Sequence, residues 1–140
     1  MEKRMSDPVL VDSNVYISLL RRGRDPIEEL RQWRSPMDLA TCGMVRLEVL
    51  RGIRDSTVFN EVAEFLDAMT VVESTSEVWS ETAQRAWKME RLGMPLPAPD
   101  LLIATSAISI EAAILTSDRH FLSIPGLTVL DPAKELPDWS

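Results

Sequence analysis

The chain has 140 residues, 45% of them hydrophobic, which is enough for one buried core, so we expect a single domain over residues 1–140. Its net charge is −7, whereas a protein that holds nucleic acid by charge alone is expected to be basic. The negative charge therefore argues against binding of nucleic acid, unless divalent cations or a basic partner protein offset that charge. No apolar run approaches the roughly 20 residues that cross a bilayer, and the N-terminus lacks the apolar stretch of a secretion signal. We expect a cytoplasmic protein with no membrane partner.

Short apolar runs alternate along the chain with segments whose apolar residues recur at helical spacing. The predicted strands are residues 9–11, 39–41, 70–72, 112–116 and 127–130. The predicted helices are residues 15–19, 26–34, 42–50, 56–69, 76–92, 100–110 and 119–122, with Ser76 as the cap of the fifth. The alternation predicts an α/β fold, a three-layer sandwich with a mainly parallel central sheet.

Two aspartates directly follow apolar runs that we interpret as strands, Asp12 and Asp118. In an open α/β sheet, ligands bind outside the carboxyl ends of the strands, so both can face one crevice. Asp100 follows a proline-rich loop at a helix N-terminus, and Glu48 lies within a helix. Converging carboxylates oppose one another's ionisation unless a cation is bound, and oxygen ligands without paired His or Cys favour Mg²⁺ or Mn²⁺. Such ions can activate water and clamp a phosphodiester.

Each acid taken alone also has a simpler structural explanation. Asp12 and Asp100 could cap helices, and Asp118 could be a turn residue. Glu48 could form a surface ion pair with Arg51. The joint occurrence of these acids at predicted strand and helix ends is what favours a functional site.

Four segments resemble the PIN domain, and specifically the VapC-type toxins of bacterial and archaeal toxin–antitoxin pairs. They are VDSNVYI, RLEVLRG, LPAPDLLIATSA and ILTSDRHFLSIPGLTVL. The resemblance implies a metal-dependent endoribonuclease, with Mg²⁺ or Mn²⁺ as cofactor, RNA as substrate, a small antitoxin as partner and a homodimer as the assembly. It implies that the catalytic, metal-holding residues are Asp12, Glu48, Asp100 and Asp118. The side chains that it implies orient this site are Asn14 and Ser117, with Ser13 and Thr116 in a similar role.

The sequence departs from the family pattern at two positions. Ser117 stands where many relatives carry Asn or Asp, so a fifth acidic ligand is absent and the number of metal ions can differ. Glu111 stands where a glycine is common, which we interpret as a change of surface charge.

Other residues have two interpretations each. Arg21, Arg22 and Arg24 follow the helix that begins at Asp12, so they could bind the phosphate backbone of a substrate, or could simply be a solvated helix end. His120 is expected in packing or at the surface in preference to a role as base. Trp79 and Trp87 share one face of a long helix, where core packing is the simpler account and a dimer contact or antitoxin groove the alternative.

Two competing functions remain open at this point. A catalytically idle PIN-like module could act only by binding, although the complete set of acids argues against this. A receiver-type or phosphatase-type phosphoryl-transfer domain is the other possibility. It is disfavoured because Asp12-Ser13-Asn14 lacks the second acid of the DxD pattern.

Overall fold

Five short apolar runs form one sheet in the computed structural model, which describes residues 7–139. The strands are β1 (Val9–Val11), β2 (Leu39–Cys42), β3 (Thr70–Val72), β4 (Ala113–Leu115) and β5 (Val129–Leu130). Their order across the sheet is β3-β2-β1-β4-β5, and all four neighbouring pairs are parallel. The predicted parallel α/β fold is confirmed.

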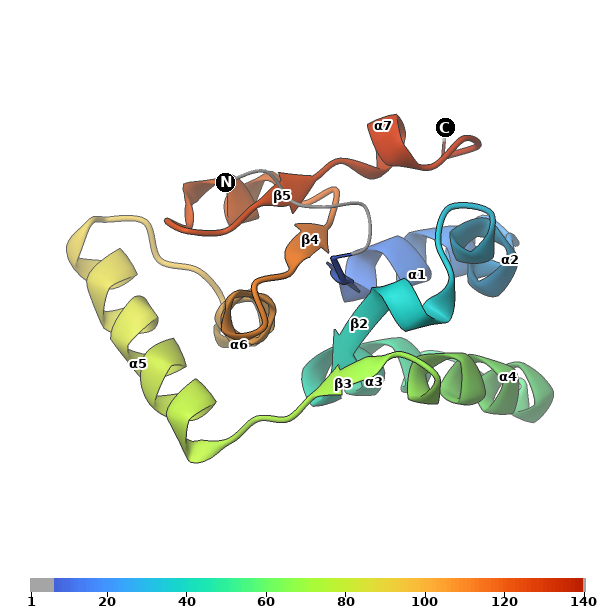
Figure 1. Cartoon of the computed structure of the whole chain (residues 1–140), viewed down its shortest axis with the longest axis horizontal. Helices are drawn as coiled ribbons and strands as arrows, with labels where there is room; N and C mark the ends of the chain where they lie inside the picture. Colours follow the sequence, from blue (N-terminus) through green and yellow to red (C-terminus); the bar gives the residue numbers. More distant parts are fainter. Residues whose placement is uncertain (1–6, 140) are drawn as a thin grey trace.

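The central strands are buried on both faces of the sheet, which explains their unbroken apolar sequences. Every residue of β1, β2 and β4 is buried. Parallel sheets have both faces covered, so their strands carry continuous apolar runs and not the alternation typical of a half-exposed sheet. The buried strands therefore lie between two helical layers, as Figure 1 shows.

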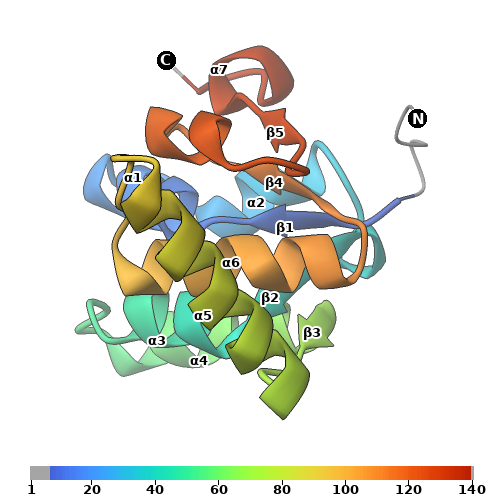
Figure 2. The ribbon, with the colours of Figure 1, turned by 90° about the vertical axis from the view of Figure 1, so that its left-hand side faces the viewer.

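The helical layers are built from seven α-helices and two short 3₁₀ segments within residues 7–139. The α-helices are α1 (Ser13–Arg21), α2 (Pro26–Arg31), α3 (Gly43–Leu50), α4 (Ser56–Asp67), α5 (Ser76–Arg91), α6 (Ala98–Ser109) and α7 (Pro132–Glu135). The 3₁₀ segments are η1 (Pro36–Asp38) and η2 (Arg119–Ser123). In Figures 1 and 2, α6 covers one face of the sheet with α5 outside it, and α3 contacts both α6 and α1. None of these helices is long and apolar enough to span a membrane.

Two helices have N-terminal ends that differ from the predicted ones, for reasons that lie in the adjacent residues. The cap of α5 is Thr75, whose Oγ1 accepts a hydrogen bond from the N–H of Val78 at 3.2 Å, so the prediction of Ser76 as the cap was wrong by one residue. α6 begins at Ala98, before the predicted Asp100, because Pro99 is tolerated in a first turn where its missing N–H has no partner to lose. Asp100 therefore lies in the first turn of α6.

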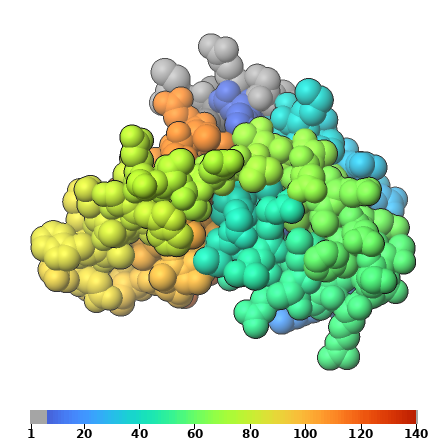
Figure 3. Space-filling view, turned by 90° about the horizontal axis from the view of Figure 1, so that it is seen from below, coloured from blue at the N-terminus to red at the C-terminus, as the bar shows by residue number. Residues whose placement is uncertain are grey.

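The outer face of α5 carries two large aromatic side chains. Trp79 is 54% exposed and Trp87 is 59% exposed, so core packing is the wrong account of both. Val78, Thr82 and Met89 supply the buried positions of α5 instead. Figure 3 shows α5 forming one side of the surface seen from below, with α4 on the other. The two tryptophans do share one face of α5, but that face is the solvent-exposed one.

Candidate active site

The pairing of β1 with β4 brings two side chains together at the carboxyl edge of the sheet. Val11 is in register with Leu115, so the next residue of each strand, Asp12 and Thr116, leaves the sheet beside the other. The N–H of Asp12 donates to the carbonyl of Leu115 at 2.9 Å. The Thr116 hydroxyl donates to Oδ2 of Asp12 at 2.8 Å, and both side chains are buried.

Thr116 is the hydrogen-bonding centre of this edge. Its Oγ1 accepts from Nδ2 of Asn14 at 3.1 Å and from the N–H of Asp118 at 3.0 Å, while its hydrogen goes to Asp12. Ser117 is exposed and makes no such bond within residues 7–139. Of the predicted orienting residues, the structure thus brings Asn14 and Thr116 to the acids and leaves Ser117 facing solvent.

Ser13 connects Asp12 to the carboxylate supplied by α3. Its hydroxyl lies 2.9 Å from Oε1 of Glu48 and 3.5 Å from Oδ1 of Asp12. A hydroxyl has one hydrogen to donate, so the shorter contact to Glu48 is the stronger hydrogen bond. Glu48 forms no ion pair with Arg51 in the described part of the chain, which removes the surface-pair explanation of this residue.

Asp118 lies on the other side of the site and is held by its own 3₁₀ segment. Its Oδ1 accepts from the N–H of His120 at 2.9 Å, and Nδ1 of His120 lies 3.2 Å from the same oxygen. Asp118 is therefore a turn residue, as its simpler explanation proposed, and this does not exclude a role in the site. By contrast, Asp12 occupies the cap position of α1 without a side-chain capping bond, so local helix capping does not account for its carboxylate. The His120 side chain is 75% exposed, a surface position as expected.

The four carboxylates act on one another electrostatically. Burial is the largest effect on Asp12 and raises its pKa to about 6, with repulsion from Asp100 and Glu48 adding to it and the Thr116 hydrogen bond opposing it. Burial also raises the pKa of Asp100, and the charges of Asp118 and Glu48 raise it further. The charges of the other acids thus oppose ionisation of Asp12 and Asp100, which relates all four carboxylates to one region of the structure.

The donor chemistry of this site fits a hard divalent cation. The ligating atoms on offer are carboxylate oxygens, the chemistry that Mg²⁺ and Mn²⁺ prefer. Oδ1 of Asn14, beside Asp12, is buried and accepts no hydrogen bond. Among residues 7–139, however, no three His, Cys, Asp or Glu side chains are close enough to form a ligand group. Coordination would require these carboxylates to move towards one another.

A thiol that the sequence did not single out lies near Asp12. Cys42 is buried at the end of β2, and burial raises the pKa of its thiol, with the charge of Asp12 contributing. A hydrogen bond between this thiol and Ser106 of α6 opposes the rise. Cys42 directly follows the predicted strand 39–41, as Asp12 follows the predicted strand 9–11, and this position is the signal that could have placed it here.

The three predicted substrate-binding arginines separate into two groups. Arg21 and Arg22 line a groove together with Ser13, Asn14 and Ser117. Arg24 turns away from this groove and pairs with Glu29, its Nε lying 2.9 Å from Oε1. The structure therefore places two of the three in a groove that also contains neighbours in sequence of Asp12 and Asp118.

All four acids lie in the part of the chain that matches a known protein family. The sequence model described as PIN domain matches residues 9–127, a range that contains all four acids. Ribonuclease VapC4 of Mycobacterium tuberculosis (strain ATCC 25618 / H37Rv) is 24% identical over 126 residues, covering 86% of this chain and 94% of the relative.

Solved toxin–antitoxin structures share the fold. DNA-bound VapBC from Salmonella typhimurium matches with a TM-score of 0.74 at 22% identity, covering 89% of this chain and 98% of that one. VapBC2 from Rickettsia felis, bound to a DNA fragment from its promoter, matches with a TM-score of 0.70 at 19% identity and the same coverage. The arrangement of strands and helices around the acids is thus one that these proteins also have.

Proposed function

This chain belongs to the PIN-domain family, and from that premise we propose that it is a metal-dependent endoribonuclease, the toxin of a VapBC-type toxin–antitoxin pair. One observation carries the proposal above the others. Asp12, Glu48, Asp100 and Asp118 come from four separate segments of the sequence, yet the hydroxyl of Ser13 lies between Asp12 and Glu48, and the charges of Glu48 and Asp118 raise the pKa of Asp100. A ribonuclease relative supports the choice of RNA as the substrate, and neighbours of the same fold in toxin–antitoxin complexes support the choice of a toxin.

The proposed reaction is hydrolysis of a phosphodiester. The oxygen of water attacks phosphorus, the bond from phosphorus to the leaving ribose oxygen breaks, and that oxygen takes up a proton. Mg²⁺ or Mn²⁺, when bound, would supply activation of the water and stabilisation of the charge that develops on the phosphate. Asp12, Glu48, Asp100 and Asp118 would hold it.

The neighbouring hydroxyls fix the carboxylates before substrate arrives. Thr116 donates to Oδ2 of Asp12, which leaves Oδ1 of the same carboxylate for a ligand. Ser13 donates to Oε1 of Glu48 and leaves Oε2 available in the same way. These hydrogen bonds select which oxygen of each carboxylate is free, while binding of a common ion still requires the carboxylates to move towards one another.

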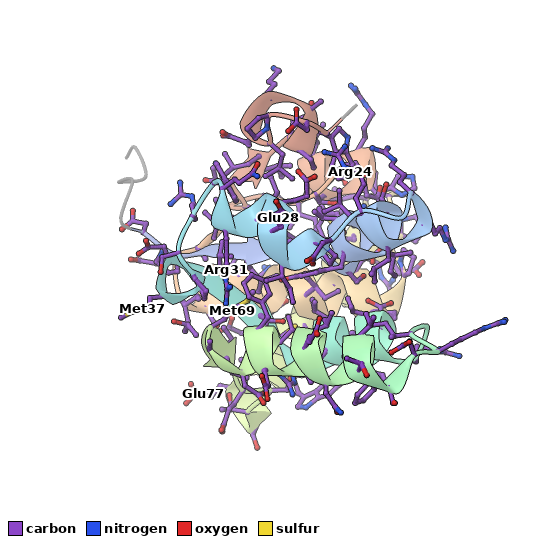
Figure 4. All side chains as sticks on the ribbon, turned by 90° about the vertical axis from the view of Figure 1, so that its right-hand side faces the viewer. Arg24, Glu28, Arg31, Met37, Met69 and Glu77 are labelled. Carbon is purple, nitrogen blue, oxygen red and sulfur yellow. The ribbon has the colours of Figure 1, made fainter. Side chains whose placement is uncertain are left out.

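We extend the proposal to an antitoxin partner and a homodimer. The net charge of −7 suits a basic partner segment, as the charge pattern suggested. A cleft of about 460 Å³ between α2 and α4 combines acidic side chains with Phe65, over which Arg31 stacks at 5.6 Å. Figure 4 shows Arg31 reaching from α2 towards α4. The exposed Trp79 and Trp87 of α5 offer apolar area for a second interface.

The proposal is tested by incubating a mixed cellular RNA pool with purified protein in Mg²⁺, in Mn²⁺ and in EDTA. The variants are Asp12→Asn and Asp100→Ala, with Asp131→Asn as a matched control because it is an exposed aspartate that caps α7. We expect metal-dependent cleavage that both site variants lose and the control retains.

A binding measurement separates the nuclease from the idle module. Mn²⁺ titration followed by calorimetry reports metal binding whether or not the RNA pool contains the right substrate. Binding that disappears in Asp100→Ala supports the enzyme. Absence of Mn²⁺ binding in folded protein, together with absence of cleavage, would support a module that works only by binding.

A further inference from the structure

A groove of about 550 Å³ leads away from the carboxylates along α1, and we refer to it as the α1 groove. One wall is the face of α1 that carries Ser13, Ile17 and Arg21, and the other includes Ser117 from the loop after β4. Residues three and four apart in a helix share a face, so this wall is continuous from the cap position at Asp12 to the last turn. The groove therefore begins at residues that flank Asp12 and Asp118 in the sequence, namely Ser13 and Ser117.

The lining of the α1 groove is polar along most of its length. Asn14, Ser18 and Ser117 offer uncharged hydrogen-bonding groups, and Ile17 is its one apolar side chain. At about 1.5 Å per residue, Arg21 lies roughly 12 Å along the helix axis from Ser13. At that distance, the guanidinium of Arg21 is too far away for a phosphate held at the carboxylates. It can reach a different phosphate of the same RNA strand.

The three arginines at and after the end of α1 differ in the number of contacts that their guanidinium groups make. Arg24 is paired with the largely buried Glu29 and also donates to the carbonyl of Asp138, where the C-terminal segment meets the loop after α1 (Figure 4). Arg22 donates to the carbonyl of Trp139 and stacks on its ring at 4.8 Å. Arg21 is exposed and forms no ion pair or hydrogen bond through its side chain with residues 7–139.

We propose that the α1 groove binds the RNA strand beside the scissile phosphate, and that Arg21 contacts a neighbouring backbone phosphate. This inference rests on the proposed nuclease function and adds a substrate-positioning residue to it. A guanidinium is well suited to phosphate because its planar donors match two phosphate oxygens. Hydroxyl and amide groups along the groove suit the ribose and phosphate oxygens of a single strand.

A protein segment fits the α1 groove less well. Protein interfaces are centred on buried apolar and aromatic anchors, and the groove offers only Ile17 for such a contact. The groove also explains how an acidic protein can hold a polyanion. Arg21 supplies an uncompensated positive charge next to the site, although the chain as a whole carries −7.

The test measures binding of a short single-stranded RNA by fluorescence anisotropy at several salt concentrations, in an Asp100→Ala background that does not cleave. Arg21→Ala is compared with Arg91→Ala, which removes the same charge from the last turn of α5 and lies outside the groove. The slope of log K against log salt becomes shallower by about 0.7 for each phosphate of a single strand that the protein no longer neutralises. Arg21→Lys is added because it retains the charge without the planar donors.

We expect Arg21→Ala to weaken binding about tenfold and to reduce the salt slope by about 0.7, because it removes a charge-assisted hydrogen bond to phosphate. Arg91→Ala should change neither, and Arg21→Lys should restore the slope with part of the affinity. Equal effects of Arg21→Ala and Arg91→Ala would show a net-charge effect only and would overturn the inference. Loss of antitoxin binding without loss of RNA binding would assign the groove to the partner and would also overturn it.

Cleavage assays separate this inference from the function on which it rests. If the chain with Arg21→Ala cleaves RNA with unchanged kcat/KM while Asp100→Ala is inactive, the nuclease stands and the role of Arg21 is wrong. If no variant binds or cleaves RNA, the proposed function fails and the inference fails with it. A higher KM for Arg21→Ala at unchanged kcat is the result that supports a positioning residue.

Discussion

The buried carboxylate of Asp12 should make the protein less stable at neutral pH, and Asp12→Asn should reverse this. The pKa of Asp12 is raised from 3.8 to about 6, chiefly by burial. A folded state with the higher pKa binds more protons than the unfolded state between these values, so stability falls as the pH rises through this window. Asparagine has nearly the same shape, accepts the same hydrogen bond from Thr116, and carries no charge to bury.

The magnitude follows from the size of the pKa change. At about 1.4 kcal/mol for each tenfold change in the acid constant, the rise from 3.8 to about 6 corresponds to about 3 kcal/mol. Asp12 is only 3% exposed, so solvent screening reduces this figure little. We therefore expect Asp12→Asn to raise the free energy of unfolding by about 3 kcal/mol at pH 7.5 and by only about 0.5 kcal/mol near pH 4, where the folded carboxyl is protonated.

Urea denaturation in EDTA at the two pH values measures this difference without a contribution from metal. Asp131→Asn is the matched control, because asparagine caps a helix about as well as aspartate and the residue is exposed. The reasoning is refuted if Asp12→Asn gives no gain at pH 7.5, or if the gain is the same at both pH values.

Three further predictions concern the same part of the molecule. Thr116→Val removes a hydroxyl that makes three hydrogen bonds, and should lower the free energy of unfolding by about 2 kcal/mol in urea; an unchanged midpoint would contradict its central role. Mn²⁺ at a hundredfold excess over its Kd should stabilise the parent chain by about 2.7 kcal/mol and Asp100→Ala much less, as thermal unfolding will report. Glu111 has a φ of +56°, so Glu111→Gly should stabilise the chain by about 1 kcal/mol, and a loss of stability would show that its side-chain contacts outweigh the backbone strain.

The fold and the positions of the acids could be predicted because both depend on short-range patterns. Unbroken apolar runs mark buried parallel strands, and an aspartate directly after such a run must leave the sheet at its carboxyl edge. Asp12 and Asp118 follow β1 and β4 as expected, and these strands are neighbours. Glu111 was interpreted as surface charge only; its positive φ shows why a glycine suits that position.

What the sequence did not reveal depends on long-range packing. The register of β1 against β4 decides that Thr116, and not Ser117, faces Asp12. Helical spacing places Trp79 and Trp87 on one face of α5 without showing whether that face meets the core. Arg24 is neutralised by Glu29 and held by the C-terminal segment, whose path beside α1 no local pattern indicates.

The strand order determines when, during synthesis of the chain, the proposed site can form. β1 pairs with β4, which follows it by about a hundred residues, and Thr116 and Asp118 come after β4. A growing chain that has not passed Asp118 lacks one acid and the hydroxyl that orients another. The proposed site therefore cannot assemble until translation has passed Asp118 and β4 has paired with β1.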